Sequence, residues 1–344
     1  MLRILFSFIS FAVCTFWCCA FALNFRTNDA AKRLLTLFLA TCSVLYFCHG
    51  LYFTIGLSHG QECLWTLCSL SVYPLYYIYI CLLTSYRPSI PKLMMLLGPG
   101  FVVAVVKYVY PTPGADLARQ ILNIIQVLGV CYFGYLRLWR FDRALKEVYS
   151  DTEGKDTTAV KRLLVAFVIT SLCSAVANGI GKQYFAQSEW HILAVLILFA
   201  VMLYLLSYMG YTRTFTSEQY ESDMSESDNP QSDAELPSQQ SDVPFIIDED
   251  LFLRQDLKIG DVVRRTGVCR TYVFNYINKE YGCSFSDYVN RLRVEYAKTL
   301  MKDSSRIKLS VIATQSGFSN EQAFYRNFRK FTGLTPQAWK DIHS

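Results

Sequence analysis

The chain of 344 residues lacks the sequence patterns of an enzyme or a metal site. It shows no nucleophile–base set, no phosphate-binding loop and no cluster of metal-ligating side chains. Its 12 cysteines include no CxxC pair, which disfavours a structural zinc site. Ten of them lie between Cys14 and Cys173, mostly in apolar runs where a thiol behaves as a small hydrophobic group. We therefore expect no enzymatic activity, no cofactor and no metal.

Lysine and arginine are absent from residues 214–250, which contain 11 acidic residues. Residues 1–213 hold 17 basic and 9 acidic side chains, and residues 251–344 hold 16 basic and 8 acidic ones. The net charges of the three parts are therefore +8, −11 and +8. Because residues 214–250 are also rich in Ser, Gln and Pro, they predict a disordered acidic linker between two domains.

Long apolar runs dominate residues 1–213. The whole chain is 52% hydrophobic with a mean hydropathy of +0.23, which is too apolar for an ordinary soluble protein. Seven segments are long enough, or nearly so, to span a bilayer, which takes about twenty residues. These segments predict an all-α, seven-helix transmembrane bundle, and they cover residues 4–23, 34–57, 63–83, 93–110, 117–136, 163–180 and 190–211.

Basic residues in the short loops predict the orientation of this bundle. With the N-terminus outside, the cytoplasmic loops carry 13 Lys and Arg residues. The outer side then has only Arg3, Arg119 and Lys182, with Lys107 near a helix end. This asymmetry predicts a multi-pass protein of a bacterial cytoplasmic (inner) membrane, with the C-terminal domain in the cytoplasm.

The first apolar segment has a second interpretation as a cleaved signal peptide. It has a short basic start, an apolar run and Ala20-Phe21-Ala22, which resembles a cleavage site. Cleavage would leave six spans, place the basic tail outside and expose Arg26, Lys32 and Arg33 on the wrong side. We therefore favour retention of the segment.

The spans contain almost no ionisable residues, with His49 and Lys107 as the inner candidates, so a transporter or proton path is disfavoured. Four tyrosines lie close together at Tyr73, Tyr76, Tyr77 and Tyr79. We favour packing and an interfacial aromatic belt for this cluster, and a ligand pocket is the alternative. The loop of residues 137–162 is expected to start as a cytoplasmic extension of the fifth span, with a basic face on anionic lipid heads.

Residues 251–344 contain the same arrangement twice: a short helix, a glycine turn and a second helix. The first copy comprises residues 256–267 and 266–282, and the second comprises 309–316 and 317–336. A long amphipathic helix, capped by residues 284–287, joins the two copies. This arrangement is the helix-turn-helix pattern.

The last helix of the second copy has an aromatic face and a polar face. Ala323, Phe324, Phe328 and Phe331 recur at helical spacing and are expected to face a core. Ser319 or Asn320 is expected to cap the helix, and Gly333 to end it. The side chains expected mostly off the aromatic face are Gln322, Tyr325, Arg326, Arg329 and Lys330. A DNA recognition helix requires such an outer face.

From about residue 257 to residue 342 the tail resembles the AraC/XylS-type DNA-binding domain. The matching residues are Gly282, Ser284, Phe285, Tyr288, Arg293, Ala297, Leu300, Ile312, Ala313, Gly317, Phe318, Ser319, Phe324, Phe328, Arg329, Lys330, Gly333, Thr335, Pro336, Trp339 and Lys340. Val263, Cys269 and Asn278 depart from the family pattern in the first half.

The resemblance implies a seven-helix domain with two recognition helices in successive major grooves, about 34 Å apart. It implies that base edges are contacted by Arg270, Thr271, Phe274 and Asn275 in the first helix, and by Asn320, Glu321, Gln322, Tyr325 and Arg326 in the second. It also implies that Arg329 and Lys330 bind phosphate.

These observations predict a membrane-anchored, sequence-specific DNA-binding transcription regulator whose membrane part is a sensor or an anchor. The alternative is a membrane receptor or transporter whose basic tail binds a protein partner. The expected partners are double-stranded DNA and the lipid bilayer; a homodimer and an unknown small-molecule ligand of the membrane domain are compatible with this function. We also hypothesise that the acidic linker competes with DNA for the basic tail.

Overall fold

The computed structural model describes residues 2–180, 189–227, 247–303 and 307–343, and in these ranges the chain forms helices without a β-strand. The predicted all-α fold is therefore confirmed. The chain divides into two compact units. The first unit comprises Met1–Arg140 and Thr157–Glu218, and the second comprises Phe141–Asp156 and Gln219–Ser344.

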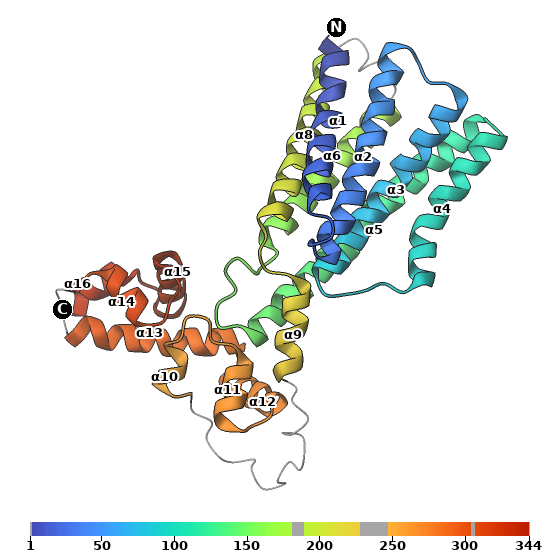
Figure 1. Cartoon of the computed structure of the whole chain (residues 1–344). Helices are drawn as coiled ribbons and strands as arrows, with labels where there is room; N and C mark the ends of the chain where they lie inside the picture. The colour runs from blue at the N-terminus through green and yellow to red at the C-terminus, as the bar shows by residue number, and fades with distance from the viewer. Residues whose placement is uncertain (1, 181–188, 228–246, 304–306, 344) are drawn as a thin grey trace. The chain divides into compact units, whose positions relative to one another are not determined.

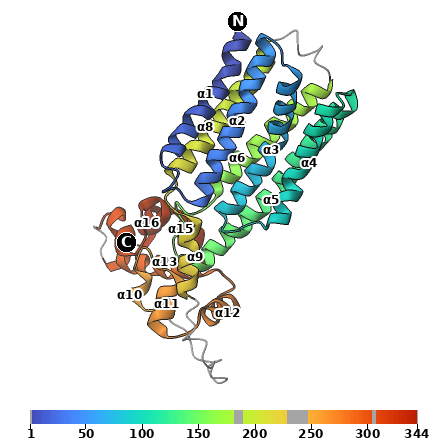
Figure 2. The ribbon, with the colours of Figure 1, turned by 45° about the vertical axis from the view of Figure 1, so that its right-hand side comes forward.

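The first unit is a bundle of long helices that run alongside one another (Figures 1 and 2). Its helices overlap all seven predicted spans, and they are α1 (Leu2–Leu23), α2 (Ala30–Thr54), α3 (His59–Leu83), α4 (Ile90–Val109), α5 (Pro113–Val148), α6 (Thr158–Ile180) and α8 (Glu189–Thr212). Among the described residues, α2, α3, α4, α5 and α8 contain stretches long and apolar enough to cross a membrane. Five membrane helices are thus supported, and the count of seven remains a prediction.

The tyrosines of α3 belong to the core of the bundle. Tyr76 and Tyr79 are buried, and the Tyr76 ring lies 5.7 Å from Phe38 of α2 and 5.6 Å from Phe167 of α6. The apolar cavity beside Tyr76 has a volume of about 10 Å³, enough for about one water molecule. These contacts favour packing over a ligand pocket for this cluster.

Lys107 lies at the end of α4 and is almost completely buried. Its ammonium group lies 2.8 Å from the carboxylate of Asp116 in α5 and 3.8 Å from that of Glu62 in α3. The paired carboxylates offset the free-energy cost of burying this charge. Lys107 therefore joins three helices and does not stand alone inside a span.

Among its described residues, the second unit has seven helices between residues 247 and 343 (Figure 1), the number that the family resemblance implies, although the first of them precedes the matched residues 257–342. They are α10 (Glu249–Phe252), α11 (Ile259–Thr266), α12 (Arg270–Tyr281), α13 (Phe285–Asp303), α14 (Leu309–Gln315), α15 (Glu321–Thr332) and α16 (Pro336–His343). Helix α13 is central: Tyr281 at the end of α12 packs on its first turn, with 4.6 Å between the ring centroids of Tyr281 and Tyr288. Its later part, with Val294, Ala297 and Met301, packs on α14, α15 and α16.

The end of α5 and the loop after it also belong to the second unit. The side chains of Phe141, Leu145, Val148 and Tyr149 are buried there, and Ser150 is buried beside them. The backbone of Tyr149 forms an antiparallel bridge with Lys258, in which the Ser150 amide donates to the Leu257 carbonyl at 3.0 Å. The cytoplasmic extension predicted for the fifth span is therefore partly a component of the C-terminal fold.

The prediction that residues 214–250 form an unstructured linker is wrong for Ser217–Ser227, which form helix α9. Its Tyr220 ring packs on Phe141, with ring centroids 5.2 Å apart, and Asp223 is buried. The polar composition of the segment did not indicate these tertiary partners, which lie elsewhere in the sequence. Residues 228–246 of the predicted linker lie outside the described residues.

Candidate functional site

The second helix-turn-helix is built around Gly317, which lies between α14 and α15. Gly317 has φ +80°, and a Cβ atom placed there would lie 2.6 Å from the Leu253 carbonyl oxygen. Only glycine can make this turn without strain and without a clash with the backbone. The turn allows Phe318, Phe324 and Phe328 to pack together in the core of the domain.

Helix α15 exposes the polar face that the sequence predicts. The side chains of Ala323, Phe324 and Phe328 are buried, and Phe331 is half-buried. The exposed residues on the opposite side are Glu321, Gln322, Tyr325, Arg326, Arg329 and Lys330. This face presents three cations, amide and hydroxyl groups, and an aromatic ring, which are the groups that contact base edges and phosphates.

Asn320 and Lys330 of the second motif have partners within the motif and in the central helix. The Asn320 side chain caps α15 by accepting a hydrogen bond of 2.8 Å from the Ala323 amide, so the predicted N-cap is confirmed. Lys330 donates a hydrogen bond of 2.6 Å to Asp287 at the start of α13. Asn320 therefore has a structural role, and Lys330 is held against the central helix.

The first helix-turn-helix has the same design. Helix α11 ends at Gly267, which has φ +71° and caps it by donating its amide to the Val263 carbonyl at 2.9 Å. Val273 and Ile277 of α12 are buried. The candidates Thr271, Phe274 and Asn275 are exposed, whereas Arg270 is half-buried. The Arg270 guanidinium lies 3.0 Å from the Met224 sulfur of α9.

Arg293 of α13 holds several segments of the second unit together. Its guanidinium donates to the Phe252 carbonyl at 2.6 Å, to the Arg254 carbonyl at 2.5 Å and to the Ser150 hydroxyl at 3.2 Å. Burial lowers the pKa of Arg293 to about 10, so the side chain stays charged at neutral pH. The arginine that the family resemblance singles out is therefore a structural residue of the domain.

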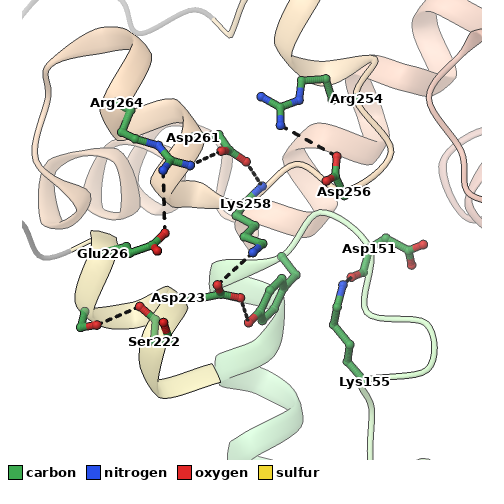
Figure 3. Close-up of polar contacts among 12 residues, drawn as sticks. Asp151, Lys155, Ser222, Asp223, Glu226, Arg254, Asp256, Lys258, Asp261 and Arg264 are labelled. Carbon is green, nitrogen blue, oxygen red and sulfur yellow. Dashed lines mark hydrogen bonds and ion pairs between the residues drawn. The ribbon is translucent and has the colours of Figure 1, made fainter. Parts of the chain in front are cut away.

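The surroundings of the first motif include acidic side chains of α9 (Figure 3). Asp223 accepts hydrogen bonds from the Lys258 ammonium at 2.9 Å and from the Tyr149 hydroxyl at 2.6 Å. Glu226 lies 3.8 Å from Arg264, whose guanidinium also donates to Asp261 at 2.6 Å. Helix α9 thus contacts both helices of the first motif.

The second motif is contacted by the loop that follows α5. The carboxylate of Glu153 lies 3.5 Å from the guanidinium of Arg326. Within the loop, the Lys155 ammonium donates to the Asp151 carbonyl at 3.0 Å and lies over the Tyr149 ring (Figure 3 labels Asp151 and Lys155). Burial in this position lowers the pKa of Lys155.

The sequence analysis did not identify the contacts made by Asp223, Glu226 and Glu153. A weak signal for the first two was present, because Tyr220 and Met224 are apolar residues at i and i+4 within an acidic run. Glu153 has no such signal. Across the described part of the chain, no group of three or more His, Cys, Asp or Glu side chains is placed to hold a metal ion.

A protein family described as "Helix-turn-helix domain" matches residues 262–342. The chain is 26% identical over 125 residues to an uncharacterized HTH-type transcriptional regulator of Bacillus subtilis, YtdP, covering 36% of this chain and 16% of that protein. It is 39% identical over 70 residues to an uncharacterized transcriptional regulatory protein of the same species, YesN, covering 20% of this chain and 19% of that protein.

The chain is also 24% identical over 88 residues to the melibiose operon regulatory protein of Escherichia coli K12, covering 26% of this chain and 29% of that protein. The chain thus spans less than a third of the length of these relatives. A solved structure of a Listeria innocua protein of unknown function is 33% identical, with a TM-score of 0.25, over 28% of this chain and 89% of that one. With the two glycine turns and the seven helices, the family match identifies the C-terminal part of this chain as an AraC-type helix-turn-helix domain.

Proposed function

We propose that this chain is a membrane-anchored transcription regulator that binds double-stranded DNA in a sequence-specific manner. The observation that carries the proposal is the two-sided helix α15, whose aromatic side is buried while Gln322, Tyr325 and Arg326 are exposed. The named relatives are transcriptional regulators, which supports the same function. The long apolar helices of the first unit support a membrane anchor or sensor.

The candidate residues of the two motifs have different roles in this proposal. Base edges are contacted by Arg270, Thr271, Phe274 and Asn275 from α12, and by Glu321, Gln322, Tyr325 and Arg326 from α15, with Asn320 limited by its capping bond. Arg329 and Lys330 contact phosphate. Since Lys330 is paired with Asp287, it contributes less to phosphate binding than Arg329.

The connecting helix suits the binding of two neighbouring major grooves. Helix α13 has 19 residues and is therefore about 28 Å long. Successive major grooves on one face of DNA are about 34 Å apart. A rigid helix of this length between the two motifs supports simultaneous binding of α12 and α15.

The proposal is tested by DNA binding of the full-length chain in lipid nanodiscs. We expect the chain to select one sequence family from a random DNA pool, with an affinity that falls steeply as salt rises, because phosphate contacts release counterions. Selection of no sequence, together with an affinity that does not depend on salt, would contradict the proposal and favour a protein partner for the basic tail.

A substitution in α15 separates base contacts from phosphate contacts. Arg326→Ala should lose about 1–3 kcal/mol of binding free energy on the selected sequence and relax the preference at one base position. Lys302→Ala, which removes an equal charge from an exposed position at the end of α13, is the control. Equal losses for Arg326→Ala on selected and random DNA would make Arg326 a phosphate contact.

A further inference from the structure

The two helix-turn-helix motifs share an unexpected property: each is contacted by an acidic segment of the same chain. Helix α9 reaches the first motif, and the loop of residues 149–156 reaches the second. We refer to these as the two docked segments. Both lie outside the family match, and the loop and residues 219–227 of α9 belong to the second unit together with the motifs.

The docked segments contact three arginines. Arg326 and Arg270 are candidate base contacts, and Arg264 lies in the helix that precedes Arg270. Glu153 lies 3.5 Å from Arg326, the candidate base contact of α15. Glu226 lies 3.8 Å from Arg264 in the last turn of α11, and Met224 lies 3.0 Å from Arg270 in the first turn of α12. A carboxylate beside a guanidinium occupies the position that a phosphate or a base acceptor requires.

The docked segments are anchored by buried contacts that do not involve these cations. The Ser150 carbonyl accepts hydrogen bonds from Ser286 at 2.8 Å and from Asn290 at 3.0 Å, both on α13. Tyr149 links this loop to α9 through its 2.6 Å hydrogen bond with Asp223. The two segments therefore support each other, and the anchors hold Glu153 and Glu226 close to their partners.

The two ion pairs with the cations, Glu153–Arg326 and Glu226–Arg264, are exposed, unlike the anchors, whereas the contact between Met224 and Arg270 is part-buried. The side chains of Glu226 and Arg264 are 60% and 64% exposed, and that of Arg326 is 61% exposed. Exposed ion pairs are weak and are screened by salt, so DNA can displace them. The geometry therefore describes a reversible contact between the docked segments and the cations.

We propose that the basic surface of the two motifs is the docking site of α9 and of the loop 149–156, and that this intramolecular docking competes with DNA. This inference rests on the proposed function. The earlier hypothesis attributed this competition to the negative charge of the whole acidic linker, and the present inference attributes it to two named carboxylates, Glu153 and Glu226. It also gives the end of α5 a role in positioning Glu153, because α5 continues directly into the loop that carries this residue.

The competition is tested by measuring DNA affinity of the full-length chain in nanodiscs at one fixed salt concentration. The DNA is the duplex that the wild-type chain selects from a random pool. Glu153→Gln and Glu226→Gln each remove a competing carboxylate and keep the side-chain shape and the buried anchors. Asp341→Asn is the matched control: it removes one negative charge from α16, where Asp341 accepts a hydrogen bond from Gln337 of the same helix.

We expect Glu153→Gln and Glu226→Gln each to tighten DNA binding about two- to fivefold, the range that corresponds to losing one exposed ion pair. The double variant should gain about tenfold if the two docked segments act independently. Asp341→Asn should have a smaller effect than either. Hydrogen exchange of α13 and α15 at the wild-type level would verify that the variants are folded.

Two outcomes would overturn the inference, and they are distinguishable. If the wild-type chain selects a sequence but the Glu153 and Glu226 variants behave like Asp341→Asn, the docking does not compete with DNA. If neither the wild-type chain nor any variant selects a sequence, the proposed function fails and the competition fails with it. If the wild-type chain selects a sequence and only the Glu153 and Glu226 variants bind it more tightly than the wild-type chain does, the result supports both the proposed function and the competition.

Discussion

Gly317 shows how one residue determines the geometry of the second motif. Its left-handed backbone conformation costs an L-residue roughly 1–2 kcal/mol, and the Leu253 carbonyl leaves no room for a methyl group. Gly333 has a similar φ of +76°, but apart from its neighbours in the chain no atom lies within 4 Å of the position a Cβ would take. Substitution at Gly333 would therefore cause backbone strain alone, whereas substitution at Gly317 would cause both strain and a clash.

We predict that Gly317→Ala lowers the free energy of unfolding of the C-terminal domain by about 3 kcal/mol or more, because strain and clash add. Gly333→Ala should lower it by roughly 1 kcal/mol through strain alone. Hydrogen exchange of α14 and α15 under increasing urea measures both values. Equal losses in the two variants would show that the close approach to Leu253 is not important.

Single residues differ in how far the sequence could predict them. The inward positions of α15, such as Phe324 and Phe328, follow from helical periodicity, and the structure confirms them. Asn320 was predicted both as the cap and, through the resemblance, as a base contact, and the cap is confirmed. The pairing of Arg326 with Glu153 could not be predicted, because the two residues are far apart in sequence and no local pattern connects them.

Some helices could be predicted from their local sequence, whereas others depend on residues that are distant in the sequence. Helices α11, α12 and α15 could be predicted because each ends at a glycine with positive φ, namely Gly267, Gly282 and Gly333. Helix α9 could not, because its stability depends on Phe141 and Tyr149. An acidic, polar segment is expected to be disordered unless another part of the chain supplies buried partners.

Helix α9 should therefore depend on the hydrogen bond between Tyr149 and Asp223. Burial, reinforced by Asp223, raises the pKa of Tyr149, so its hydroxyl remains a donor at neutral pH. We predict that Tyr149→Phe destabilises the docking of α9 by about 1.5–3 kcal/mol, the contribution of a hydrogen bond to a charged group. Faster hydrogen exchange in α9 would show this loss.

Tyr325→Phe is the matched control for this measurement. It removes a hydroxyl group at an exposed position of α15 and should leave exchange in α9 unchanged. If Tyr149→Phe also left α9 unchanged, the packing of Tyr220 on Phe141 would be sufficient to hold the helix.

At the scale of the whole chain, α5 connects the two units covalently. Its 36 residues give a length of about 54 Å, whereas the hydrocarbon core of a bilayer is about 30 Å thick. The helix is thus long enough to cross a membrane and to continue beyond it as the segment that joins the second unit.

The distribution of the basic residues predicts the orientation of the chain, and this orientation decides whether DNA can be reached at all. We predict that a fluorescent reporter fused after Ser344 is active in the cytoplasm, and that a phosphatase active only outside the cytoplasm is active when fused after Ser58. The loop at Ser58 joins α2 to α3 and lies outside if the N-terminus is outside. The reverse pattern would indicate that the first apolar segment is cleaved, which places the basic tail outside. In that orientation the basic tail could not reach the DNA in the cytoplasm. The two fusions therefore test the orientation and, with it, whether the proposed function can operate in the cell.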